Sequence, residues 1–77
     1  MKATLARQQK TSFKQELIYG YTVEGTPNEL IQLITNEGFI DSFDKEGRPI
    51  LWTRRRLVDA VVEITAKGRI VLRGEEV

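Results

Sequence analysis

The chain contains no cysteine and no histidine among its 77 residues. Without cysteine there can be no disulfide and no thiolate zinc site, and without histidine the usual general base and an imidazole metal ligand are both missing. Only carboxylates, Lys, Tyr, Ser and Thr remain for chemistry. We therefore expect a protein that is not an enzyme, with no catalytic, cofactor-binding or metal-ligating residues.

Long apolar runs are also scarce. Apart from Pro49–Trp52, no uninterrupted apolar stretch exceeds three residues, whereas a membrane span needs about 20. The opening segment, MKATLARQQK, lacks the apolar stretch that secretory signals carry. We expect a cytoplasmic protein that has no membrane partner.

The small size of the chain limits how it can be stabilised. With 40% apolar residues it has room for one core, and a domain of this size buries only about 60% of its unfolded surface. Because disulfides and thiolate metal sites are excluded, stability has to come from good packing or from self-association.

The net charge of +1 conceals strong segregation along the chain. Residues 1–14 carry a charge of +4, residues 15–47 carry −6, and residues 48–74 carry +5, before two final glutamates. Separated patches of opposite sign would make a field that the near-zero total hides. The alternative is that the acidic and basic segments fold against each other and neutralise locally.

Residues 1–14 are interpreted as a flexible basic arm in front of a single α+β domain formed by residues 15–77. The large apolar side chains of this segment, Leu5 and Phe13, follow no periodic pattern. A segment that cannot bury apolar surface cannot offset the entropy lost when it is ordered.

Residues 15–24 predict the first strand, because their side chains alternate. Leu17, Tyr19, Tyr21 and Val23 point to one face, and aromatic and β-branched residues are abundant. Gly25 ends this strand.

A helix is predicted over residues 27–37. Thr26 supplies an N-cap hydroxyl, Pro27 occupies the first helical position, and Glu29 completes a capping box. Gly38 supplies a left-handed C-terminal cap, with Phe39 placed to contact the helix. The apolar side of the helix consists of Leu30, Ile31, Leu33 and Ile34.

Two further segments, residues 39–43 and 48–53, flank the turn residues Asp44–Gly47 and predict a β-hairpin. Pro49 near the start of the second segment indicates an edge strand or the beginning of a strand.

Residues 54–73 fit two structures. As a hairpin, Ala66–Gly68 forms the turn, Ile64 pairs with Ile70, and Val62 pairs with Leu72. As a helix over residues 54–66, the segment would give the order β-α-β-β-α-β of a ferredoxin-like fold. We favour the hairpin, because branched residues are frequent and three arginines in a first helical turn would oppose the helix dipole.

The fold class is therefore α+β, a small antiparallel sheet with one well-capped helix, residues 27–37, on one face. The ferredoxin-like arrangement with a second helix at 54–66 is the alternative. The predicted core consists of Leu17, Ile31, Ile34, Phe39, Leu51, Val62, Ile64, Ile70 and Leu72.

The most concentrated positive charge follows Trp52, in the run Arg54-Arg55-Arg56. Arginine donates to phosphate in a bidentate manner, and an indole can stack on a base. These residues and the basic side chains around them are the candidate binding site for nucleic acid or for a partner: Arg48, Trp52, Arg54, Arg55, Arg56, Lys67, Arg69 and Arg73.

Two classes of function follow from this reading. The favoured one is a small binding module that acts through protein–protein interaction and associates with a protein partner or with a second copy of itself, because short strands leave sheet edges to cover. The alternative is a nucleic-acid-binding protein that uses Arg54–Arg56 and the basic arm. Arginines that are salt-bridged inward would favour the interaction module.

Overall fold

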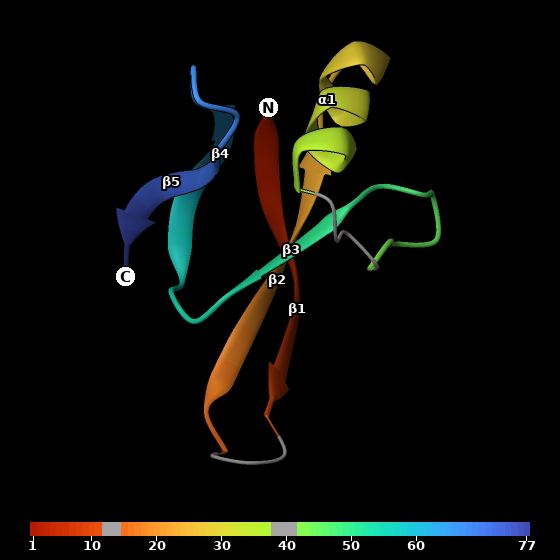
Figure 1. The fold of residues 1–77 in the computed structure, drawn as a ribbon. Coiled ribbons are helices and arrows are strands. Elements are labelled where there is room, and N and C mark those ends of the chain that lie inside the picture. Colours follow the sequence, from red (N-terminus) through yellow and green to blue (C-terminus); the bar gives the residue numbers. More distant parts are fainter. Residues whose placement is uncertain (12–14, 38–41) are drawn as a thin grey trace.

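A computed structural model describes residues 1–11, 15–37 and 42–77 (Figure 1). The five strands form one antiparallel sheet in the order β3-β2-β1-β4-β5, which confirms an α+β fold with an antiparallel sheet. In chain order the elements are β1 (Lys2–Lys10), β2 (Leu17–Glu24), α1 (Pro27–Glu37), β3 (Ile50–Thr53), β4 (Leu57–Ile64) and β5 (Ile70–Glu76).

Strand β1 lies at the centre of the sheet, so the expected flexible arm is wrong for residues 2–10. This strand pairs with β2 from Lys2↔Glu24 to Lys10↔Leu17. On its other side, the backbone of Met1 exchanges two hydrogen bonds with Val62, at 3.1 and 2.7 Å. Residues 12–14 of the expected arm lie outside the described residues.

The arm was predicted from side chains, whereas backbone pairing orders the segment. Its main contribution to the core is the small side chain of Ala3, which a search for large apolar groups overlooks. The backbone of β1 is paired with β2 from Lys2 to Lys10 and with β4 at Lys2, so a mostly polar sequence can occupy this position.

A β-bulge in β1 changes the face to which one basic side chain points. Leu5 pairs with Tyr21 but Arg7 pairs with Gly20, so Ala6 is the extra residue. Because successive side chains alternate in direction, this insertion moves Arg7 to the face opposite Leu5. We call the face with Leu5 and Tyr21 the inner face and the other the outer face.

Helix α1 has the bounds that the sequence predicts. The backbone N–H of Thr26 donates to Oε1 of Glu29 at 2.9 Å, and the N–H of Glu29 donates to Oγ1 of Thr26 at 3.3 Å. The N–H of Thr26 and then its hydroxyl hold the pKa of Glu29 below the ordinary value. The predicted cap at Gly38 and its contact from Phe39 lie outside the described residues.

No helix in the described part of the chain is long and apolar enough to cross a membrane.

The segment from 57 to 64 is strand β4, so the helix over 54–66 and the ferredoxin-like order are wrong. The hairpin has the predicted register, with Val62↔Leu72 and Ile64↔Ile70. Its turn requires Gly68, whose φ of +81° lies in the left-handed region.

A second bulge bends β4 near its beginning. Val58 pairs with Glu75 and Val61 with Arg73, so two residues of β4 face only Gly74 on β5. Asp59 adopts a φ of +54° there. A Cβ atom at position 74 would lie 2.9 Å from the carbonyl oxygen of Val58, so glycine is needed opposite the bulge.

The core lies between the inner face and α1. Tyr21 is buried within it, and its hydroxyl accepts a hydrogen bond of 2.6 Å from the N–H of Leu57. Leu33 brings the helix into this core and is 0% exposed. The buried members of the cluster are Ala3, Tyr21, Val23, Leu33, Leu57, Ala60 and Val62.

Part of the predicted core is wrong. Val62 is buried as expected, but Leu17, Ile31 and Ile34 are 44%, 61% and 40% exposed. The helix turns Leu30 and Leu33 toward the sheet, because a small curled sheet contacts only a narrow stripe of the helix. Of the remaining predicted core residues, Leu51, Ile64, Ile70 and Leu72 are half-buried and Phe39 lies outside the described residues.

The neighbouring helical positions 33 and 34 provide a matched test of this packing. Leu33→Ala removes a fully buried side chain, so we expect the free energy of unfolding to fall by about 2 to 5 kcal/mol. Ile34→Ala removes an exposed side chain and should cost less than about 1 kcal/mol. Urea titration of both variants checks this, and equal losses would contradict the orientation of α1.

Candidate functional site

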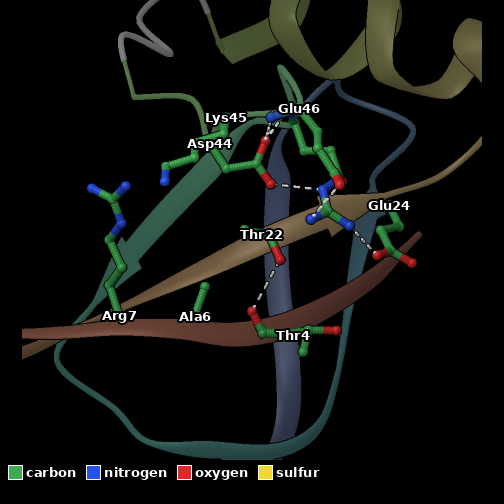
Figure 2. Close-up of a pocket in the computed structure, with 9 residues that line it drawn as sticks. Thr4, Ala6, Arg7, Thr22, Glu24, Asp44, Lys45 and Glu46 are labelled. Atoms are coloured by element: carbon green, nitrogen blue, oxygen red, sulfur yellow. Dashed lines mark hydrogen bonds and ion pairs between the residues drawn. The ribbon is translucent and has the colours of Figure 1, made fainter.

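Arg48 is the centre of an ion-pair cluster that joins a turn to the sheet. Its guanidinium contacts Asp44 at 2.6 Å, Glu46 at 2.9 Å and, on β2, Glu24 at 2.5 Å (Figure 2). One candidate binding residue is therefore already surrounded by three carboxylates from its own chain. We call these four residues the Arg48 cluster.

The turn that carries the Arg48 cluster is also held by its own backbone. Oδ1 of Asp44 accepts hydrogen bonds from the N–H groups of Glu46 and Arg48, at 2.9 and 2.8 Å. Gly47 has a φ of +82°, and its N–H donates to the carbonyl oxygen of Asp44. Hydrogen bonds within the chain therefore hold the turn in place without a ligand.

The Arg48 cluster also shifts the pKa of Asp44. Desolvation of this carboxyl acts to raise its pKa, but the hydrogen bonds from Arg48 and from the N–H of Glu46 outweigh it, so the pKa lies below the ordinary value. The hydrogen bond to Asp44 raises the pKa of Arg48 in turn.

Trp52 lies against the outer face of the sheet. A Cβ atom added at Gly20 would come within 2.9 Å of its ring, so the glycine leaves the space that the indole fills. The side chain is half-buried, and its Nε1–H donates to Oγ of Ser42 at 3.4 Å. Trp52 is thus packed within the fold and is not a fully exposed platform for stacking.

The three consecutive arginines lie in the exposed turn between β3 and β4. Arg54 forms an ion pair with Glu16 at 3.3 Å, and Arg55 donates from Nη2 to the carbonyl oxygen of Leu72 at 3.2 Å. No side-chain partner of Arg56 is present within the residues that the structure describes.

The remaining basic candidates belong to the β4–β5 hairpin. Lys67 lies in its turn and Arg69 follows directly after it, at the opposite end of β4 from Arg54–Arg56. Arg73 pairs with Glu63 across the two strands at 3.0 Å. The eight candidate residues are therefore distributed over separate parts of the fold, and several of them are paired locally.

A pocket of about 440 Å³ lies between the outer face and the turn that carries Arg48 (Figure 2). Sequence reasoning missed this site, because Arg7 was assigned to a flexible arm and Lys45 to a simple turn. The pocket is lined by Thr4, Ala6, Arg7, Thr22, Glu24, Asp44, Lys45, Glu46 and Arg48.

The walls of the pocket come from three parts of the chain. Thr4 and Thr22 are paired across β1 and β2, and the hydroxyl of Thr22 donates to the carbonyl oxygen of Thr4 at 3.3 Å. The Arg48 cluster forms a second wall. Arg7 and Lys45 line the pocket from β1 and from the turn, and both side chains are exposed.

Comparison with known proteins gives no relative: no family model, no curated protein and no solved structure matches the chain. Within residues 1–11, 15–37 and 42–77, no group of acidic side chains is placed to hold a metal ion.

The low pKa of Asp44 makes a testable contribution to stability. Because the folded protein holds this carboxyl below its unfolded pKa, the contribution is present above the unfolded pKa and is lost as the pH falls through the folded pKa. We expect Asp44→Asn to lower the melting temperature at neutral pH and to reduce its fall on acidification.

Asp59→Asn is the matched control, because Asp59 has no ion pair among the described residues and asparagine tolerates its positive φ. Thermal unfolding at a series of pH values checks the expectation. It is contradicted if Asp44→Asn retains the acid dependence of the parent protein.

Proposed function

We propose that the chain is a small, non-enzymatic binding module that acts through protein–protein interaction and associates with a second copy of itself. The observation that carries this proposal is the pairing of its arginines. Arg48, Arg54 and Arg73 each form ion pairs with glutamates of the same chain. Charges that are neutralised in this way are less able to bind phosphates.

The edge strands of the sheet support the same proposal. Strand β5 is one of the two edge strands. Val62 uses its backbone groups to bond with Met1, so Leu72, which lies opposite Val62, directs its own backbone groups away from β4. The N–H of Leu72 is therefore available to another strand, while Arg55 contacts its carbonyl oxygen. Unpaired strand edges of this kind bind further strands.

The other edge strand, β3, is shorter and partly covered. It has four residues, and the N–H of Ile50 already donates to the carbonyl oxygen of Ser42. We therefore assign self-association to β5, by antiparallel pairing of two copies about a two-fold axis.

Val71 provides the test of this assignment. It pairs with Glu63 in β5, so its side chain lies on the outer face next to the edge of the sheet. Val71→Lys would place like charges across the two-fold axis. We expect the parent protein to form a dimer when its concentration is varied over about a hundredfold range. In the variant, the dissociation constant of the dimer should rise by at least about tenfold.

The control is Val58→Lys, which introduces the same charge on β4, one strand away from the edge of the sheet. Val58 is 44% exposed, so the variant should fold and should dimerise like the parent. Sedimentation velocity measures both. A parent that stays monomeric throughout contradicts self-association, and a stronger effect of Val58→Lys would move the interface to the outer face.

Nucleic-acid binding is the second candidate, and the exposure of the turn with Arg54–Arg56 favours it. If this turn contacts phosphates, replacing its three arginines by alanine should flatten the log–log salt dependence of binding by about two to three units. Alanine at Lys67 and Arg69, the basic candidates at the other end of β4, shows whether these residues contribute to binding as well. Absence of binding at low salt would exclude this function.

A further inference from the structure

The pocket on the outer face has a charge distribution that the proposed self-association does not explain. Arg7 and Lys45 both line it, and neither has an acidic partner within ion-pair distance in the described ranges. Figure 2 shows the ends of both side chains on the side of the pocket away from Glu24. Two cations that share one cavity favour an anion between them.

The direction of Arg7 results from a specific feature of β1. A regular strand would place Arg7 on the inner face together with Leu5. The bulge at Ala6 moves this side chain to the face of Thr4 and Thr22 instead. Bulges often redirect a side chain toward a site in this way.

The acidic side chains of the opposite wall are already paired within the chain. Both carboxylate oxygens of Asp44 accept hydrogen bonds, and the guanidinium of Arg48 contacts all three acids of its cluster. Their charges are therefore directed to Arg48, which leaves Arg7 and Lys45 as the basic groups available to a ligand.

We propose that this pocket binds a small oxyanion, a phosphate or carboxylate group of a small molecule, between Arg7 and Lys45. Both side chains donate several hydrogen bonds to oxygen, and the guanidinium of arginine can donate to two oxygens of a carboxylate or phosphate at once. Thr4 lines the same pocket.

Inorganic phosphate is the probe, titrated into the isotope-labelled protein at constant ionic strength while amide chemical shifts are recorded. We expect saturable shifts that include Thr4, Arg7, Thr22 and Lys45. A parallel titration with acetate separates phosphate from carboxylate as the preferred group. Shifts that increase linearly, without saturation, in both titrations would overturn the proposal.

Lys45→Gln and Arg7→Gln each remove one charge from the pocket and should weaken binding by about tenfold. The control is Lys67→Gln, which removes the same charge from the exposed turn of the β4–β5 hairpin. It should change the affinity for phosphate by less than about twofold. Since Lys45 is exposed on a turn, its variant tests the site even if Arg7→Gln impairs folding. If Lys67→Gln weakened phosphate binding as much as the two pocket variants do, binding would depend on net charge alone. That result would overturn the proposed site.

This proposal and the proposed self-association fail independently. Phosphate binding is measured on the parent at a concentration where sedimentation defines one species, and Val71→Lys leaves the pocket residues unchanged. A protein that binds phosphate but never dimerises would refute only the interaction through β5.

Discussion

The central position of β1 is the constraint on which the rest of the fold depends. This strand joins a β2–β3 unit on one side to the β4–β5 hairpin on the other. Its contact with β4 is short, with Lys2↔Val61 as the one residue pair of the described ladder, supplemented by the bonds between Met1 and Val62. Without β1 the two halves would be joined by the turn between β3 and β4 and by core contacts such as the hydrogen bond from the N–H of Leu57 to Tyr21.

Local patterns predicted the elements that are determined by neighbouring residues. The start of α1 followed from Thr26, Pro27 and Glu29, and the register of the β4–β5 hairpin followed from the turn at Gly68. Both depend on interactions within a few residues. Leu33 is buried and Ile34 is exposed, and helical periodicity alone does not predict this difference. The position of the sheet decides which apolar side chain of α1 is covered.

The pocket could not be predicted from the sequence, because it too depends on how distant segments are placed. Its parts come from β1, β2 and the turn before β3, and they meet only because β1 enters the centre of the sheet. The bulge at Ala6 leaves no signal in the alternation of a mostly polar segment, so the direction of Arg7 could not be inferred. Asp44 and Glu46 were recognised as turn residues, but their common partner, Arg48, became evident only from the folded turn.

Ion pairs within the fold neutralise part of the charge that is segregated along the chain. Arg48 and Arg54, from the basic segment, contact Glu24 and Glu16 at opposite ends of β2, from the acidic segment. Because the turn before β3 and the turn after it each bring one arginine to β2, these pairs join β3 to its neighbour at both ends. Arg7 and Lys45 are not part of this exchange among the described residues, and both line the pocket on the outer face.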